Sequence, residues 1–471
     1  MTAPPRVAVV GGGFAGLAAA VRLARRGAAV TLVERRPFLG GRAYSFTDPA
    51  TGDVVDNGPH ALMGAYTAAL DFLGEIGATA KLAFQPRLRV ALADPGLGLG
   101  VVAAPPLPGP LQAPAALLRY RLLGPRDRVR LLTGAVRLAA RSSGSLSRTT
   151  VAEALAAVGQ SPAACARFWH PLAIATLNEL PGAAAAAPFA AVLRKAFFAG
   201  ARAARFALSR VPLSELYTVD AQRAIERAGG TVRTGAAVAT LALGPEGVEA
   251  LVLRDGTRVA ADAVVLAVPV AALLRLLPSR LRDAPPFRPL ASVGTSPIVS
   301  VHVWLDRHVG WGGPFLGLLG GRAQWLFDAG VAADGGHRIA SVTSGARFWD
   351  DAADDEIAAE VLADAAAVLP ALGRVRVRRT LVIRERHATL SLTPAADAVR
   401  PDVETPVANL FLAGDWVQTH LPATIESAVI SGRAAADRAL PAATRRARPV
   451  PWRPDAPAPS ALPSATLPPS P

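Results

Sequence analysis

Three glycines close to the N-terminus have the spacing of a dinucleotide-binding turn. Gly11, Gly13 and Gly16 form a G-x-G-x-x-G pattern within RVAVVGGGFAGLAAAVRLARRGAAVTLVERR. In such a turn the first glycine permits a tight bend, the second lets the backbone approach a pyrophosphate, and the third lets helix and strand pack closely. Glu34 follows about 20 residues later, where a carboxylate can accept hydrogen bonds from a ribose diol. The pattern predicts a dinucleotide site, and Glu34 argues against the 2′-phosphate of NADP.

A second group of residues that could do chemistry lies in VVDNGPHALMGAY, from Val54 to Tyr66. This stretch places an Asp, an Asn, a Gly-Pro turn and His60 in a chain otherwise rich in Ala, Leu and Val. Imidazole titrates near neutrality, so His60 could act as a general acid or orient a hydroxyl group. Equally, His60 could serve only to hydrogen-bond backbone or cofactor carbonyls.

The glycines require a strand before them and a helix after them. Residues 7–10 are apolar and β-prone, residues 15–26 favour a helix that Gly27 ends, and residues 30–33 predict the second strand. The helix N-terminus would offer free N–H groups and a positive dipole end to the phosphates. A glycine-rich turn without a ligand is the alternative, but the strand, helix and acid together favour the binding site.

Downstream, RRPFLGGRAYSF contains Gly40, Gly41 and Arg42, and here the chain resembles the FAD-dependent amine oxidases and carotenoid desaturases. In that family the glycines approach the cofactor and the arginine meets its phosphates. Residues 409–440, NLFLAGDWVQTHLPATIESAVISGRAAADRAL, resemble the family's closing strand, Gly-Asp loop and helix. The resemblance implies that Asp415 binds the ribityl or pyrophosphate region. It also implies that the helix N-terminus faces the pyrimidine end of the flavin, where its dipole stabilises a reduced flavin.

The resemblance identifies FAD as the cofactor. A third segment, GGTVRTGAAVATLAL, resembles the part of the family that reaches the adenine, with Val238 at the matching place. The residues expected to contact FAD are Gly11, Gly13, Ala15, Gly16, Glu34, Arg35, Gly41, Arg42, Gly58, Val238, Gly414, Asp415, Thr424 and Ile425.

The same resemblance implies an α/β fold in which a discontinuous Rossmann-like FAD-binding domain accompanies an α+β substrate domain, as in amine oxidases. We expect the FAD-binding domain at 1–65, 205–275 and 400–441. We expect the substrate domain in two insertions, helical at 66–204 and sheet-forming at 276–399. The runs PIVSVHVWL and RVRVRRTLVIRER in the second insertion predict strands. Residues 442–471 are rich in proline and predict disorder.

Two further patterns narrow the function. The pattern Asp-Asn-Gly-x-His-x-x-x-Gly-Ala-Tyr and the segment FWHPLAIATLNELP resemble the hydroxysqualene dehydroxylases, or squalene-associated FAD-dependent desaturases. This resemblance implies reductive removal of a hydroxyl from a squalene-like alcohol in squalene or hopanoid synthesis, with an external electron donor such as NADPH or a reductase. His60 is then the candidate catalytic residue, and His170 and Glu179 are next in line.

Three alternatives stay open. A carotenoid or phytoene desaturase would use the same flavin in the opposite direction, and a non-catalytic flavin-binding scaffold at a membrane would use it for structure only. An amine oxidase fits less well, because neither Lys81 nor Lys195 falls in the sheet region and Leu421 stands where an aromatic residue is expected.

Composition limits the partners. The 471 residues carry 50 Lys and Arg against 36 Asp and Glu, a formal charge of +14. This excess fits an anionic partner such as an acidic membrane surface, or a composition bias in the gene, since only two of the cations are lysines. No nucleic-acid-binding module and no metal-binding motif is visible. The single cysteine, Cys165, excludes an internal disulfide and fits a reducing compartment.

Residues 117–144, LLRYRLLGPRDRVRLLTGAVRLAARSSG, mix Leu and Val with Arg at helical spacing. Such a helix can lie on an acidic bilayer or can be an ordinary solvated helix. We expect no signal peptide and no spanning helix. The sequence therefore predicts a cytoplasmic enzyme, with or without contact to the inner face of the membrane, that acts on a long isoprenoid.

Overall fold

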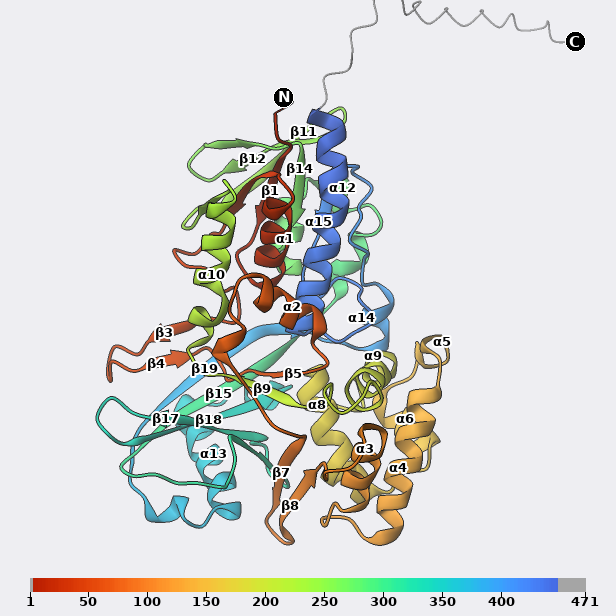
Figure 1. The fold of residues 1–471 in the computed structure, drawn as a ribbon, viewed down its shortest axis with the longest axis vertical. Coiled ribbons are helices and arrows are strands. Elements are labelled where there is room, and N and C mark those ends of the chain that lie inside the picture. The colour runs from red at the N-terminus through yellow and green to blue at the C-terminus, as the bar shows by residue number, and fades with distance from the viewer. Residues whose placement is uncertain (1–2, 448–471) are drawn as a thin grey trace, which may run out of the picture.

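The computed structural model describes residues 3–447 and arranges them around two large sheets (Figure 1). The first sheet is parallel, with the strand order β10-β2-β1-β14-β20. Its strands are β1 (Arg6–Val10), β2 (Ala29–Val33), β10 (Thr231–Arg233), β14 (Ala263–Leu266) and β20 (Leu410–Leu412). The strands expected at 7–10 and 30–33 are confirmed to within one residue at each end, and the closing strand expected near the start of residues 409–440 is β20.

This sheet is buried on both faces, which explains why its strands β1, β14 and β20 are almost entirely apolar. Val7 and Val9 pack toward a layer of helices, whereas Ala8 and Val10 pack toward a small antiparallel sheet. The helices are α1 (Phe14–Arg25), α10 (Leu213–Arg227) and α15 (Ile425–Ala447), and the small sheet comprises β11 (Val238–Gly244), β12 (Gly247–Leu253) and β13 (Arg258–Ala260).

The second large sheet has the strand order β19-β15-β18-β17-β16-β7-β8 and is antiparallel except between β16 and β7. Helix α13 (Asp354–Val368) packs on one of its faces. Its strands are β7 (Arg89–Asp94), β8 (Gly98–Ala103), β15 (Thr295–Leu305), β16 (Phe315–Leu318), β17 (Trp325–Val331), β18 (His337–Ser344) and β19 (Val377–Leu390). The two strand-like runs of the second insertion are therefore confirmed as parts of β15 and β19.

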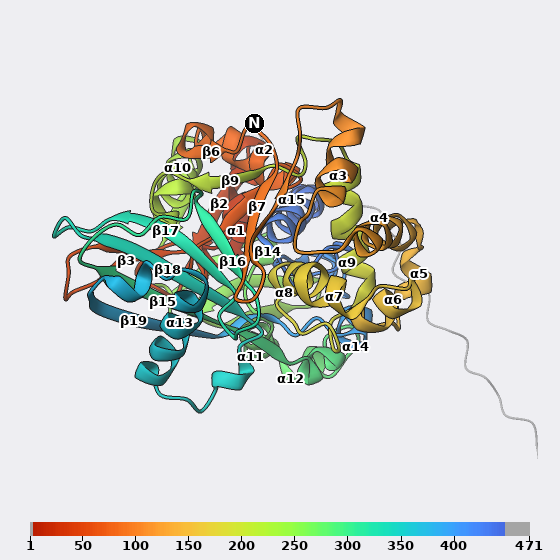
Figure 2. The ribbon, with the colours of Figure 1, turned by 90° about the horizontal axis from the view of Figure 1, so that it is seen from below.

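A helical region lies beside the second sheet (Figure 2). It includes two π-helical turns, η2 (Cys165–Trp169) and η3 (Arg194–Phe198), a feature often found at functional sites. Its helices are α3 (Gly109–Leu118), α4 (Pro125–Ala140), α5 (Ser143–Leu146), α6 (Val151–Ala157), α7 (Pro162–Ala164), α8 (His170–Leu177) and α9 (Ala186–Leu193).

Short elements connect these parts. The strands are β3 (Ser45–Thr47) paired with β4 (Val54–Asp56), and β5 (Ala61–Met63), β9 (Phe206–Ser209) and β6 (Leu82–Phe84) in a second small sheet. The α-helices are α2 (Thr67–Glu75), α11 (Val270–Leu276), α12 (Ser279–Arg282) and α14 (Pro394–Ala398), and the 3-10 turns are η1 (Thr79–Lys81), η4 (Arg288–Ser292), η5 (Arg347–Trp349) and η6 (Leu372–Arg374).

The structure corrects two sequence expectations. Residues 66–204 are not helical throughout, because β7 and β8 form a hairpin that extends the seven-stranded sheet through β16. Predicted disorder from 442 was wrong for residues 442–447, which continue α15 because Ala442 and Ala443 are buried against its neighbours. Residues 448–471 of that predicted tail lie outside the described part of the chain. Within residues 3–447, no helix is both long enough and apolar enough to span a bilayer.

One buried histidine of the second sheet lies near Asp56 of the β3–β4 hairpin. His302 on β15 is 5% exposed, and its Nε2 has no hydrogen-bond partner among the described residues. Burial lowers the pKa of His302 to about 4. The folded protein therefore holds a neutral imidazole that becomes protonated on unfolding below about pH 6.5.

We expect His302 to make folding stability depend on pH. Between about pH 6.5 and 4, His302 binds a proton in the unfolded chain but stays neutral in the folded chain. The free energy of unfolding should therefore fall as the pH falls. This single group should contribute on the order of 3 kcal/mol. Urea unfolding at several pH values should show a shallower acid dependence in His302→Gln than in the wild type. The exposed His420→Gln should keep the wild-type slope, and equal slopes in all three proteins would contradict the assignment.

Candidate flavin site and adjoining pocket

The glycine-rich turn has the geometry that its spacing predicted. Gly11 has φ +106°, and a Cβ on it would lie 2.3 Å from the carbonyl oxygen of Ala267. A Cβ on Gly16 would lie 1.9 Å from the carbonyl oxygen of Gly11. Neither position can hold a larger residue without moving β1, α1 or β14. These two glycines therefore permit the bend and the close packing of helix on strand.

Gly13 and Gly41 form a cradle with no side chains. A Cβ on Gly41, which has φ +58°, would lie 3.1 Å from the Cα of Gly13, while a Cβ on Gly13 would lie 3.6 Å from the Cα of Gly41. Gly13 is the N-cap of α1 and has no side-chain cap, so the first N–H groups of the helix, including that of Ala15, face a ligand position. This cradle fits the pyrophosphate of FAD.

Glu34 ends β2 beside this cradle and is 7% exposed. Its Oε2 accepts the N–H of Gly12 at 2.7 Å and its Oε1 accepts the N–H of Arg36 at 2.9 Å. Because each carboxylate oxygen has two acceptor positions, the carboxylate is fixed and can still accept a ribose hydroxyl. Arg35 lies exposed next to it, and Val238 is half-buried at the start of β11.

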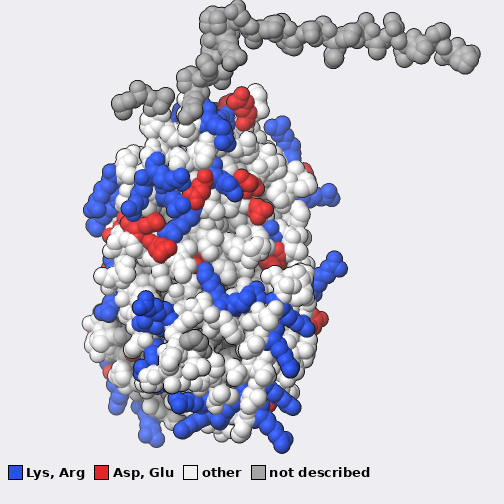
Figure 3. All heavy atoms as spheres, turned by 45° about the vertical axis from the view of Figure 1, so that its right-hand side comes forward, with Lys and Arg blue, Asp and Glu red and all other residues white. Residues whose placement is uncertain are grey.

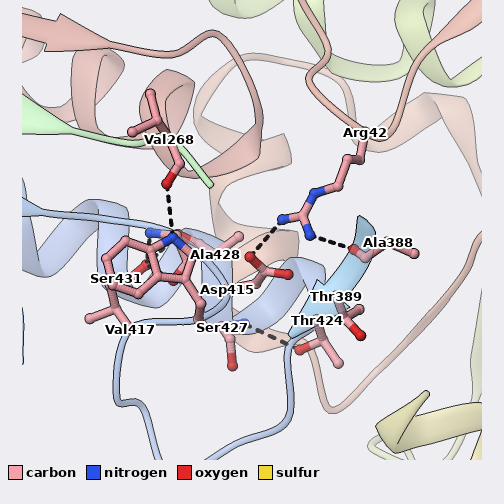
Figure 4. A network of polar contacts seen from close by, with 12 residues as sticks. Arg42, Val268, Ala388, Thr389, Asp415, Val417, Thr424, Ser427, Ala428 and Ser431 are labelled. Atoms are coloured by element: carbon pink, nitrogen blue, oxygen red, sulfur yellow. Dashed lines mark hydrogen bonds and ion pairs between the residues drawn. The ribbon is translucent and has the colours of Figure 1, made fainter. Parts of the chain in front are cut away.

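Arg42 and Asp415 pair with each other across the two ends of the chain (Figure 4). Arg42 Nη2 lies 2.6 Å from Asp415 Oδ1, and Nη1 donates to the carbonyl of Ala388 on β19. Burial alone would lower the pKa of Arg42, but the charge and hydrogen bond of Asp415 outweigh it and raise this pKa. Both residues were expected to meet the cofactor, and the structure brings them to one place.

The loop after β20 is held by contacts that sequence reasoning missed. Arg400 is 7% exposed and donates to the backbone carbonyls of Asp415, Trp416, Val417 and Leu421. Burial lowers the pKa of Arg400 despite the nearby carboxylates of Asp397 and Asp415. Because these four acceptors in the loop are backbone atoms, no sequence motif could have signalled this role.

Gly414 opens the same loop with φ +144°, and its N–H donates to the hydroxyl of Ser431 on α15 at 2.9 Å. The loop returns to Thr424, whose carbonyl accepts the N–H of Ala428 at 3.0 Å. Thr424 therefore precedes α15, and Ile425 is the first residue of that helix. The loop and the start of α15 lie together, as the sequence predicted.

The stretch from Val54 to Tyr66 passes between the sheets. Gly58 lies against β15, because a Cβ on it would be 2.8 Å from Ser300 Oγ. His60 Nδ1 is 2.6 Å from the carbonyl oxygen of Gly58, so the proton sits on Nδ1 and Nε2 is an acceptor. Burial lowers the pKa of His60, so its ring is neutral near pH 7. This geometry favours an orienting role over that of a general acid.

The other two catalytic candidates differ in their surroundings. Glu179 is 1% exposed, with Oε1 2.7 Å from Arg347 Nη1 and Oε2 accepting the hydroxyl of Ser391 at 2.5 Å. These contacts lower its pKa, although burial opposes them. Glu179 is therefore a buried anion committed to Arg347 and Ser391, which does not favour the catalytic role for which it was a candidate. His170 is half-buried at the start of α8, and burial lowers its pKa.

A pocket adjoins the start of α15, and its charged residues were not predicted as site residues. Lys195 on η3 lies there with its Nζ 2.5 Å from Glu426 Oε1. Tyr66 is also in the wall, where burial, followed by the charge of Glu426, raises its pKa to about 12. The pocket is lined by Met63, Ala65, Tyr66, Thr176, Val192, Lys195, Ala196, Leu421, Pro422, Thr424 and Glu426.

His308, Asp328 and His337 come together at the far side of the second sheet. His337 Nδ1 accepts the N–H of Val309 at 3.2 Å, so its proton is on Nε2, which faces Asp328 Oδ1 at 3.1 Å. A metal at Nε2 would require the other tautomer and would break the bond to Val309. The cluster is therefore explained by hydrogen bonding.

Comparison with known proteins shows which protein family this chain belongs to. The model of the flavin-containing amine oxidoreductases matches residues 14–440. The chain belongs to this family. It is 32% identical to hydroxysqualene dehydroxylase of Sinorhizobium fredii, over 93% of this chain and 99% of that protein. The corresponding protein of Rhodopseudomonas palustris is also 32% identical, over 93% and 98%.

Other members of the family are more distant. The 15-cis-phytoene desaturase of Solanum lycopersicum is 24% identical over 92% of this chain and 77% of that protein. The structure of cyclohexylamine oxidase from Brevibacterium oxydans is similar with a TM-score of 0.67 at 19% identity, over 95% of this chain and 100% of that one. The amine oxidase-like fold is thereby confirmed. This family member is an FAD-dependent oxidoreductase.

The glycine cradle provides a direct test of the flavin site. Gly13→Val should fold, because a Cβ there meets only Gly41 at ordinary contact distance, but its side chain should occupy the pyrophosphate position. We expect FAD affinity to fall at least tenfold, that is by about 1.4 kcal/mol or more. Flavin absorbance after desalting and the melting temperature of the apoprotein measure the two effects. Gly182→Val is the control, because a Cβ at Gly182 meets no atom within 4 Å, and a fully loaded Gly13→Val protein would contradict the site.

Proposed function

We propose that this enzyme removes the hydroxyl group of hydroxysqualene reductively and releases squalene. The observation that carries the proposal is the 32% identity to hydroxysqualene dehydroxylases over nearly the full length of both chains. The pocket beside the start of α15 supports it, because most of its lining residues are apolar and so suit a hydrocarbon chain. Its polar side chains, which come from Tyr66, Thr176, Lys195, Thr424 and Glu426, could then act on one functional group.

The reaction replaces a C–O bond by a C–H bond. The hydroxyl leaves as water, which requires a proton, and the carbon left behind is an allylic or cyclopropyl-stabilised cation. Bound FAD, in its reduced form, supplies the hydride that this carbon accepts. The protein must align the carbon and exclude water, since water would recapture the cation. An external two-electron donor such as NADPH or a reductase restores the reduced flavin.

The following roles belong to the proposal. Gly11, Gly13, Ala15 and Gly16 form the pyrophosphate turn, Glu34 holds the ribose, and Arg42 with Asp415 meets the ribityl chain or phosphates. Thr424 and Ile425 present the N-terminus of α15 to the pyrimidine end of the flavin, where the helix dipole favours the reduced form. Arg35, Gly41, Gly58 and Val238 complete the contacts.

His60 completes the site as a group that orients the hydroxyl of the substrate. Its Nδ1–H is committed to the carbonyl of Gly58, and its neutral Nε2 can accept the O–H of an alcohol. The domain division rests on the strands of the parallel sheet, which come from residues 6–33, 231–266 and 410–412. These fall in the three segments that we assign to the FAD-binding domain.

Product analysis tests the function. The holoenzyme with reduced FAD should be given hydroxysqualene and phytoene side by side without oxygen, and the products should be identified by mass spectrometry. We expect squalene, which lacks the oxygen of the substrate, and unchanged phytoene. Dehydrogenated phytoene formed with oxidised FAD would instead identify a desaturase. No product from either substrate, together with a flavin that does not respond to reductant and substrate, would point to a scaffold.

A substrate this apolar resides in membranes, and the outer surface of α3 and α4 is suited to contact one. Leu111, Leu118, Val129 and Val136 are between 42% and 54% exposed. Arg126, Arg130 and Arg137 share the outer stripe of α4 with the two valines. Arg and Lys atoms outnumber acidic ones over the lower part of the face in Figure 3. We propose that this α3–α4 surface rests on an acidic bilayer at the inner face of the membrane.

Charge reversal tests the membrane proposal. The triple variant Arg126→Glu, Arg130→Glu, Arg137→Glu should bind anionic vesicles at least 100-fold more weakly, because each surface arginine contributes about 1 kcal/mol. The control reverses Arg223, Arg254 and Arg258, which are exposed on α10 and around the β12–β13 turn. Vesicle sedimentation with and without an anionic phospholipid measures binding. If both triple variants lost the same affinity for anionic vesicles, binding would depend on the net charge of the protein and not on the α3–α4 surface.

A further inference from the structure

Lys195 occupies an unusual position for a lysine. It lies in the π-helical turn η3, at the end of α9, and its side chain keeps 30% of its surface exposed within the pocket wall. Its Nζ lies 2.5 Å from the carboxylate of Glu426, which is 1% exposed. The pair therefore places one cation in a pocket whose other walls are mostly apolar.

Glu426 holds this cation in a fixed position, because its carboxylate is itself bound by the first turn of α2. Its Oε1 also accepts the N–H of Ala68 at 3.2 Å and the hydroxyl of Thr67 at 3.4 Å, and its Oε2 accepts the N–H of Ala69 at 2.9 Å. Glu426 itself lies in the first turn of α15 and these donors lie in the first turn of α2. The position of Nζ is thus determined by regular secondary structure.

The ammonium group of Lys195 has more N–H donors than the pair with Glu426 uses. A lysine side chain carries three N–H groups, and within residues 3–447 Nζ has Glu426 as its hydrogen-bond partner. Two N–H groups therefore remain for a ligand in the pocket. Thr424, which precedes α15, lies in the same wall, so the pocket adjoins the helix end that we assign to the flavin.

We propose that Lys195 is a catalytic residue that binds the leaving hydroxyl of the isoprenoid alcohol and donates the proton with which it departs as water. This inference rests on the proposed function. The C–O bond breaks, its electron pair and the proton of Nζ leave with the oxygen, and the carbon takes its hydride from reduced FAD. Nζ recovers a proton from solvent, and the external two-electron donor reduces the flavin again.

His60 and Lys195 then divide the task. His60 directly precedes β5, whose last residue, Met63, lines the pocket, so the proposal places His60 at the edge of the pocket and outside its lining residues. The neutral ring of His60 can accept the O–H of the alcohol, whereas Nζ can only donate to its oxygen. In a hydroxyl held this way the C–O bond is polarised, which helps the oxygen to leave as water.

The chain offers a matched control for Lys195. Lys81 also pairs with a carboxylate at 2.5 Å, that of Asp220, and its side chain is also 30% exposed. Lys81 ends the turn η1 and its carboxylate partner lies on α10, outside the residues that line the pocket. Replacing either lysine by methionine removes one charge and one ion pair from a side chain of similar length.

The experiment has a binding part and a turnover part. Hydroxysqualene and squalene are titrated into holoenzyme with oxidised FAD, and the change in flavin absorbance gives both affinities. We expect wild type and Lys81→Met to prefer the alcohol, and Lys195→Met to lose about 10- to 100-fold in affinity for the alcohol only. In single turnover with reduced FAD, Lys195→Met should be slower by about two to four orders of magnitude.

The outcomes separate the two proposals. If wild type does not convert hydroxysqualene, the proposed function fails, and the binding preference alone then decides whether Lys195 recognises a hydroxyl. If wild type converts it and Lys195→Met retains both the preference and the rate, Lys195 has no such role. Should Lys195→Met lose FAD or unfold, Lys195→Arg decides: it keeps the pair with Glu426 but displaces the donors, and a wild-type rate in it would overturn the proposal.

Discussion

The ion pair between Arg42 and Asp415 joins the two ends of the chain at the place where the flavin site must form. Arg42 follows the first two strands of the parallel sheet, and Asp415 follows the last one. Arg400 fixes the loop after Asp415 through four backbone carbonyls. The glycine cradle, Glu34 and the start of α15 can converge only when these distant segments are joined. The site is therefore a product of the complete fold and not of one motif.

The parts of the site that the sequence predicted are those whose geometry is local. Gly11 and Gly16 are required by backbone contacts within one strand, turn and helix, so their spacing alone predicts their position. Glu34 follows from the same unit. The strands β15 and β19 were equally visible, because long β-prone runs need no knowledge of their partners. The resemblance to a flavoenzyme family then supplied the cofactor.

Residues whose roles depend on distant partners could not be predicted. Arg400 holds the loop by donating to main-chain carbonyls, and a single arginine carries no signal for that. Glu179 was a catalytic candidate in the sequence, and its partners Arg347 and Ser391 lie far along the chain, so no local signal showed that it forms a buried ion pair. The β7–β8 hairpin was missed because its short runs become strands only beside β16. Lys195 was set aside because it lies outside the sheets, yet the π-helical turn brings it to the pocket.

Glu426 connects the stability of the fold with the chemistry proposed for the pocket. A carboxylate that is 1% exposed is costly unless its oxygens are paired, and here the donors come from Thr67, Ala68, Ala69 and Lys195. The same contacts cap α2, join it to α15 and hold the ammonium. Because this cation balances the buried charge, the fold itself retains an ammonium group in a pocket whose other walls are mostly apolar. In the proposed reaction, this arrangement would keep one cation beside the substrate, held in place by a carboxylate that is almost fully buried.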